Sequence, residues 1–87
     1  MSKPFGGEEA IATIFAELRA AEKKHPNWPD DLFEHMTIIG EEYGEACQAV
    51  LKYKYEGGPF YDVIRELSQT AAMCIRTLIN LEETKDE

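Results

Sequence analysis

The chain has 87 residues, which is the length of one small domain and leaves no room for separate substrate and cofactor domains. Its 9 basic and 17 acidic side chains give a formal charge of −8, which repels a phosphate backbone and argues against duplex nucleic acid as a partner. A hydrophobic content of 44% with 30% charged residues is ordinary for a globular chain. We therefore expect a single folded domain over residues 1–87, with flexible tails at 1–7 and 83–87.

The first predicted helix runs from about Glu8 to Lys24, because apolar residues recur there at three- and four-residue steps. Pro26 and Pro29 end that pattern, since proline lacks an amide donor and restricts the residue before it. A second helix is predicted from residue 29 or 30 to about Tyr53. We expect His35 to be an ordinary surface residue of that helix.

The second helix carries a wide apolar arc, and we expect Met36 and Tyr43 to lie in the core. Gly40 and Gly44 are four residues apart on one face, where missing side chains let another helix approach closely. The alternative is a helix that breaks near Gly40, because each glycine costs roughly 1 kcal/mol relative to alanine.

A turn is predicted at residues 57–59, because Gly57 and Gly58 can adopt positive φ and Pro59 suits the start of a helix. Residues 52–56 alternate like a short strand, but nothing else in the chain alternates enough to pair with them, so we expect a helix end. A third helix is predicted from Pro59 to about Leu81.

These elements predict an all-α fold, an antiparallel bundle of three to four helices per chain completed by oligomerisation. A chain this small buries only about 60 to 65% of its unfolded surface and needs a disulfide, a metal or a partner subunit. We expect Cys47 and Cys74 to be small buried thiols, so a homo-oligomer, a dimer or a tetramer, is the expected support. The first residues lack an apolar signal core and no long apolar segment follows, which favours a cytoplasmic protein without membrane contact.

Some acidic residues fall on apolar helix faces. At about 100° per residue, Glu42 is flanked by Ile38, Ala46 and Ala49, and Glu45 borders the same patch. Glu66 on the third helix borders the core in the same way. The turn at residues 57–59 makes the two helices antiparallel neighbours, so these carboxylates can face one groove.

Carboxylates that converge beside an apolar core repel one another unless they are protonated or a cation neutralises them. Oxygen ligands suit Mg²⁺ or Mn²⁺, and Mg²⁺ typically binds few carboxylates together with substrate phosphates. The implied substrate class is a phosphate ester or anhydride. The alternative is an acidic stripe on the helix surface that is simply solvated or meets a basic partner.

The sequence Gly40-Glu-Glu-Tyr-Gly-Glu-Ala46, followed by Arg65-Glu-Leu-Ser-Gln-Thr-Ala-Ala72, resembles the MazG-like, all-α nucleoside triphosphate pyrophosphohydrolases. The likeness spans roughly residues 25–81. The resemblance implies Mg²⁺-dependent hydrolysis of a nucleotide to its monophosphate and pyrophosphate. The ExxE motif of that family corresponds to Glu42 and Glu45 in this sequence.

The same resemblance implies that Glu42, Glu45, Glu66 and Gln69 hold the metal. Gln69 stands where the family has an aspartate, so its amide oxygen can ligate a cation but brings no charge. Asp62, one turn before Glu66, is a candidate replacement. Glu41 is the candidate catalytic residue that orients the attacking water.

Two further residues are candidates for nucleotide binding. Trp28 lies in a segment similar to the aromatic stretch that precedes the first motif in relatives, where the ring packs on the base; a role in closing the end of the bundle is the alternative. Lys54 is a candidate for phosphate binding. Lys52, Arg65 and Arg76 could also offset phosphate charge, although for all four residues ordinary surface pairing with nearby glutamates is the expected role.

Two other functions remain open from the sequence. One is a non-catalytic helical oligomer of the same fold that binds nucleotide or metal weakly, because Gln69 replaces the aspartate of the family. The other is a protein-interaction module whose acidic stripe binds a basic partner, with an affinity that falls steeply as salt rises.

Overall fold

The computed structural model describes residues 6–81, and over this range the chain forms three helices and no strand. The helices are α1 (Gly7–Lys24), α2 (Leu32–Glu56) and α3 (Phe60–Ile79). The all-α prediction is confirmed, and the predicted boundaries agree with the observed ones to within three residues. The predicted tails at 1–7 and 83–87 lie outside the described residues, except that Gly6 precedes α1 and Gly7 begins it.

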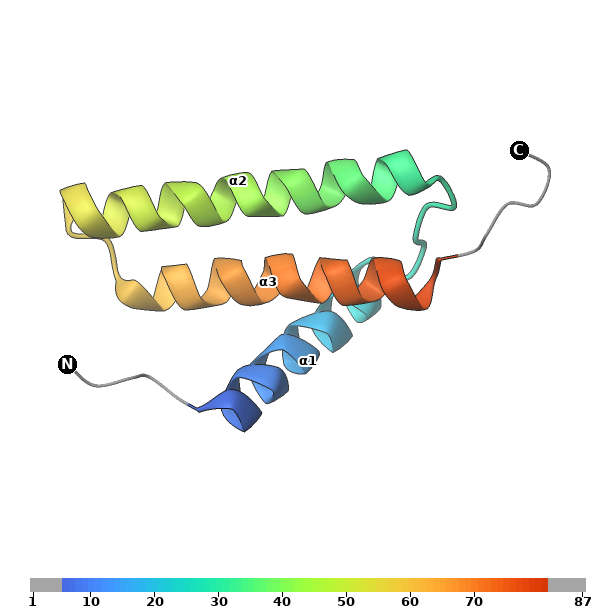
Figure 1. Cartoon of the computed structure of the whole chain (residues 1–87), viewed down its shortest axis with the longest axis horizontal. Coiled ribbons are helices and arrows are strands. Elements are labelled where there is room, and N and C mark those ends of the chain that lie inside the picture. The colour runs from blue at the N-terminus through green and yellow to red at the C-terminus, as the bar shows by residue number, and fades with distance from the viewer. Residues whose placement is uncertain (1–5, 82–87) are drawn as a thin grey trace.

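α2 and α3 form an antiparallel hairpin, and α1 crosses α3 at an angle on the side away from α2 (Figure 1). Both α1 and α2 pack on α3, and within the described residues α1 and α2 do not pack on each other. α3 is therefore the central helix of the chain. None of the described helices is long and apolar enough to span a membrane.

The helix ends follow from local chemistry. The Asp31 side chain caps α2 by accepting a hydrogen bond from the Phe33 amide at 3.0 Å. Gly57 ends α2 with φ 71°, a left-handed conformation that glycine adopts without steric cost. The sharp turn that Gly57 allows returns α3 along α2, as predicted. α2 is unbroken at Gly40, so the alternative of a helix break there is wrong.

The core is small. The buried apolar side chains of the described chain are six, and three of them are alanines: Leu18, Ala46, Ala49, Val63, Ala72 and Met73. Leu18, Ala72 and Met73 form the central cluster where α1 meets α3. The small alanine side chains let α1 and α2 pack closely against α3, and these contacts form the core.

Several predicted core positions are exposed in the single chain. Met36 is 55% exposed and Tyr43 59%, and both Cys47 and Cys74 are exposed, so these predictions are wrong for one chain alone. No helix approaches the face of Gly40, because a Cβ built there meets nothing within 4 Å. The apolar arc of α2 is wider than the part of its surface that α3 covers, so the rest of the arc stays exposed.

Candidate functional site

Three carboxylates from two helices meet at the interface of α2 and α3. Glu42 and Glu45, one turn apart on α2, and Glu66 on α3 each place one oxygen within 4.8 Å of the others. Glu42 and Glu66 are half-buried, while Glu45 is exposed. The convergence predicted from helix periodicity is confirmed.

The electrostatics of this carboxylate cluster oppose full ionisation. Burial raises the pKa of Glu42 above its ordinary value, and repulsion by Glu45, Glu66, Glu41 and Glu17 adds to the rise. Burial also raises the pKa of Glu66, followed by the adjacent Glu45 carboxyl, while Arg65 acts in the opposite direction. The cluster thus holds more negative charge than its surroundings stabilise.

Two oxygens of the cluster have no hydrogen-bond partner. Glu42 Oε2 and Glu66 Oε2 are both buried and unpaired. A buried acceptor without a partner costs free energy, about 1–3 kcal/mol for a neutral group and more for a charged one. Unpaired carboxylate oxygens from neighbouring helices fit the ligand preference of a hard divalent cation such as Mg²⁺. The residues present therefore fit the metal that the sequence predicts.

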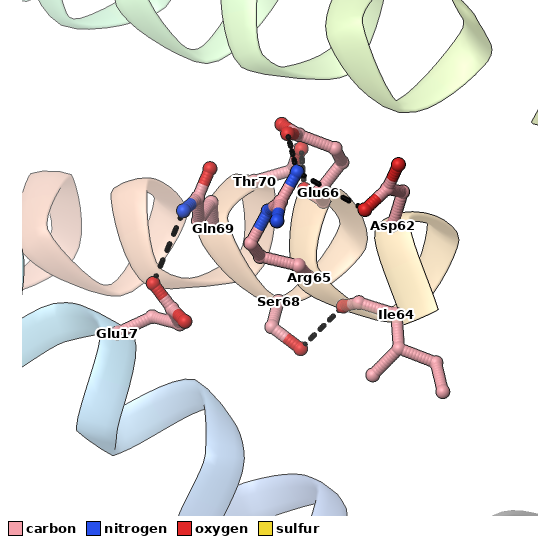
Figure 2. Close-up of polar contacts among 8 residues, drawn as sticks. All are labelled: Glu17, Asp62, Ile64, Arg65, Glu66, Ser68, Gln69 and Thr70. Atoms are coloured by element: carbon pink, nitrogen blue, oxygen red, sulfur yellow. Dashed lines mark hydrogen bonds and ion pairs between the residues drawn. The ribbon is translucent and has the colours of Figure 1, made fainter. Parts of the chain in front are cut away.

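Gln69 lies one turn beyond Glu66 on α3, and its side chain lies between α1 and α2 (Figure 2). Its Nε2 donates a hydrogen bond to Glu17 Oε1 on α1 at 3.2 Å, while its amide oxygen lies on the side facing α2 (Figure 2). α1 thus brings a fourth glutamate beside the site. Sequence reasoning did not identify Glu17, because only the packing of α1 on α3 places it there.

Asp62 does not join the carboxylate cluster. Arg65 lies between two acids, with Nη2 3.3 Å from Asp62 Oδ1 and 3.5 Å from Glu66 Oε1 (Figure 2). Asp62 is therefore paired with Arg65, and Glu17 is the additional acid that contacts Gln69. Glu41 is exposed and lies outside the cluster, although its charge contributes to the raised pKa of Glu42.

A cleft of about 640 Å³ adjoins the carboxylate cluster. α1, α2 and α3 all contribute to its walls, together with the segment between α1 and α2. Its lining includes Glu17, Trp28, Glu42, Gln69 and Arg76. A predicted metal ligand and the predicted stacking residue therefore share one cleft.

Lys54 is not part of this cleft. It lies three turns beyond Glu42 on α2, about 18 Å along the helix axis. Its Nζ lies 5.2 Å from the centre of the Tyr55 ring. The structure thus brings Trp28 to the site but not Lys54.

Arg76 is the unexpected cation of the cleft. It is only 4% exposed, so the prediction of ordinary surface pairing is wrong. Its guanidinium donates hydrogen bonds to the backbone carbonyls of His25, at 2.6 Å, and Ala21, at 3.4 Å. It also lies 4.4 Å from the centre of the Trp28 ring, at a cation–π distance.

His35 was also expected at the surface, and it is 1% exposed. Its ring packs 4.9 Å from Trp28, and its Nε2 hydrogen-bonds the carbonyl of Pro29. Trp28 therefore contacts both an imidazole and a guanidinium. No local pattern in the sequence indicates this arrangement, because His35 lies in the first turn of α2 and Arg76 in the last turn of α3.

Comparison with known proteins finds no family model that matches the chain, and no curated protein or solved structure that is significantly similar to it.

Proposed function

We propose that this protein is a Mg²⁺-dependent nucleoside triphosphate pyrophosphohydrolase, which hydrolyses a nucleotide to its monophosphate and pyrophosphate. The observation that carries the proposal is the convergence of Glu42, Glu45 and Glu66 beside a cleft that contains Trp28. The resemblance to MazG-like enzymes, which rests on the same glutamates, supports it further.

Glu42, Glu45 and Glu66 would hold the cation, which relieves their mutual repulsion and pairs the buried oxygens of Glu42 and Glu66. The Gln69 amide oxygen is the proposed fourth ligand, because the hydrogen bond to Glu17 uses its nitrogen. Mn²⁺ accepts the same oxygen ligands. When bound, the cation would stabilise negative charge on the phosphate oxygens of the substrate.

Trp28 is the proposed surface on which the base stacks, since aromatic rings stack with any nucleobase. The cleft volume of about 640 Å³ lies in the range of small-molecule sites, about 300–1,000 Å³. Glu41 remains the proposed residue that orients the water. A role for Lys54 in phosphate binding has no support from its position within one chain.

The proposed enzyme is a cytoplasmic homo-oligomer, a dimer or a tetramer. Large apolar side chains that remain exposed on α2 and α3 support assembly. The unpaired thiols of Cys47 and Cys74 suit a reducing compartment.

The test combines two measurements on the full chain. A screen for pyrophosphate release over ordinary, deoxy and damaged nucleoside triphosphates, with Mg²⁺ and Mn²⁺, reports activity. Calorimetric titration with Mg²⁺ reports metal binding. We expect Glu42→Gln to lose both, and Glu34→Gln, an exposed carboxylate two turns earlier on α2, to retain both.

The outcomes separate the alternative functions. Mg²⁺ binding without pyrophosphate release across the panel would contradict the enzyme and support a non-catalytic oligomer. Absence of Mg²⁺ binding, together with salt-sensitive binding to basic peptides, would support an acidic interaction module.

A further inference from the structure

The segment between α1 and α2, residues 25–31, carries Trp28 and forms no helix of its own. It passes the C-terminal end of α3 and joins two helices that do not pack on each other within the described chain (Figure 1). Since no helical hydrogen bonds hold this segment, its position depends on the contacts that it makes with its surroundings. The place of the proposed base-stacking residue therefore depends on those contacts.

Two carbonyl groups of the segment accept hydrogen bonds from buried side chains. Arg76 on α3 donates through Nη2 to the carbonyl of His25 at 2.6 Å, and His35 on α2 donates through Nε2 to the carbonyl of Pro29. The proton of this second hydrogen bond belongs to the imidazole, because a carbonyl oxygen only accepts. The segment is thus tied to α3 before Trp28 and to α2 after it.

The same two side chains contact the ring of Trp28. The guanidinium carbon of Arg76 lies 4.4 Å from the ring centre, and the imidazole of His35 lies 4.9 Å away at an interplanar angle of 33°. Trp28 also packs against the central apolar cluster, but apolar packing is not directional. The indole Nε1 is buried without a hydrogen-bond partner among the described residues. The contacts that orient the ring are therefore those with His35 and Arg76.

His35 and Arg76 stand in a fixed relation to the proposed metal ligands. His35 precedes Glu42 by seven residues on α2, and Arg76 follows Gln69 by seven residues on α3. Seven residues are about two helical turns, so each pair lies on one face of its helix, about 10 Å apart along the axis. Both helices therefore place Trp28 about two turns from the acidic end of the cleft.

We propose that His35 and Arg76 are positioning residues, which hold Trp28 at the distance from the carboxylate cluster that a nucleotide spans with its sugar and phosphates. This inference rests on the proposed function, because it assigns the base to Trp28 and the cation to the cluster. His35 does not line the cleft, so it acts on a bound nucleotide through Trp28. A ring that is free to move stacks less well on the base and places the phosphates less accurately.

His35 tests this role better than Arg76 does, because Arg76 also binds the Ala21 carbonyl at the end of α1. His35→Gln keeps an amide donor for the Pro29 carbonyl and removes the ring that packs on Trp28. His35→Phe keeps a ring and removes the donor. If circular dichroism shows that the glutamine variant is unfolded, the phenylalanine variant takes its place in the experiment below.

A double-variant cycle measured by calorimetry tests the proposal on the full chain. The probes are the α,β-imido analogues of the four common deoxynucleoside triphosphates with Mg²⁺, which resist cleavage of the bond that the proposed enzyme breaks. We expect Trp28→Leu and His35→Gln each to weaken analogue binding by about ten-fold, the order of one base stack. The double variant should bind no more weakly than Trp28→Leu, since His35 acts through the ring.

Mg²⁺ alone should bind His35→Gln with wild-type affinity, because the carboxylates are unchanged. Glu34→Gln, an exposed neighbour on α2, should keep wild-type affinity for both the analogues and Mg²⁺. Additive losses in the double variant, wild-type analogue binding by His35→Gln, or loss of its Mg²⁺ binding would each overturn the positioning role.

Pyrophosphate release from ordinary triphosphates is measured separately. A wild type that binds the analogues and releases no pyrophosphate would refute the proposed enzyme, while a non-additive cycle would still support the positioning of Trp28. A wild type that binds none of the analogues would overturn the positioning role.

A second measurement needs no variant. Trp28 is the single tryptophan of the chain, so time-resolved fluorescence anisotropy reports on this ring alone. A ring held by His35 and Arg76 should follow the tumbling of the whole molecule, without a separate motion on the picosecond-to-nanosecond timescale. A fast local component of the decay would overturn the proposal.

Discussion

Glu42 is the residue at which burial and like charge act together against ionisation. Its pKa is raised above the ordinary 4.5, so the folded chain holds this proton more tightly than the unfolded chain does. The resulting stabilisation is fully present below the ordinary pKa and is lost as pH rises through the higher pKa of the folded state. Without a divalent cation, the ionised Glu42 therefore weakens the fold at neutral pH.

The corresponding prediction concerns Glu42→Gln in the presence of a chelator. As pH rises from about 4 to about 8, the melting temperature of the wild type should fall relative to that of Glu42→Gln. Thermal unfolding followed by circular dichroism measures the difference. Glu34→Gln, which removes a favourable charge from the first turn of α2, should not reproduce it. A difference that is independent of pH would contradict the assigned electrostatics.

Saturating Mg²⁺ should reverse the order of stability at neutral pH. A cation that binds only the folded wild type raises its free energy of unfolding, while Glu42→Gln gains little. An identical Mg²⁺ effect on both proteins would show that Glu42 is not a ligand.

The hydrogen bond between Gln69 and Glu17 gives a second prediction at this scale. Gln69→Glu places two carboxylates at a contact that is now 3.2 Å long, and without a cation it should lower the free energy of unfolding by about 1–3 kcal/mol. Adding Glu17→Gln exchanges the two side chains, so that residue 17 donates and residue 69 accepts. The double variant should therefore recover most of the lost free energy of unfolding. Chemical denaturation of the two single variants and the double variant measures this coupling. Additive losses would show that the two side chains act independently.

Among the elements, a buried cation links the C-terminal end of α1 to α3. Arg76 on α3 donates to the carbonyls of Ala21 and His25 at the end of α1, and its plane packs near Trp28. Arg76→Lys keeps the charge but loses the planar fork that reaches two carbonyls. We expect a loss of about 2 kcal/mol in the free energy of unfolding, measured by chemical denaturation. Arg65→Lys, at a surface ion pair, should lose less than about 1 kcal/mol.

The helices themselves were predictable because their signals are local. The Gly57 turn and the apolar period of each segment located the three helices within a few residues. Helix periodicity cannot say which part of a wide apolar arc another helix of the same chain will cover. Met36 and Tyr43 are predicted core positions for that reason, whereas both are exposed in the single chain.

For the molecule as a whole, the carboxylate cluster was predictable and its surroundings were not. Glu42, Glu45 and Glu66 lie on two consecutive helices joined by a short turn, so spacing and antiparallel packing bring them together. Glu17 and Arg76 take their positions from the angle at which α1 crosses α3. No local pattern in the sequence specifies that angle.

The central position of α3 has a mechanical consequence. Because α1 packs on α3 and not on α2 within the described chain, a swing of α1 on α3 would change the width of the cleft. The same swing would leave the spacing of Glu42, Glu45 and Glu66 intact, since these residues belong to the other pair of helices. The width of the cleft and the spacing of the acidic groups are thus set by different pairs of helices.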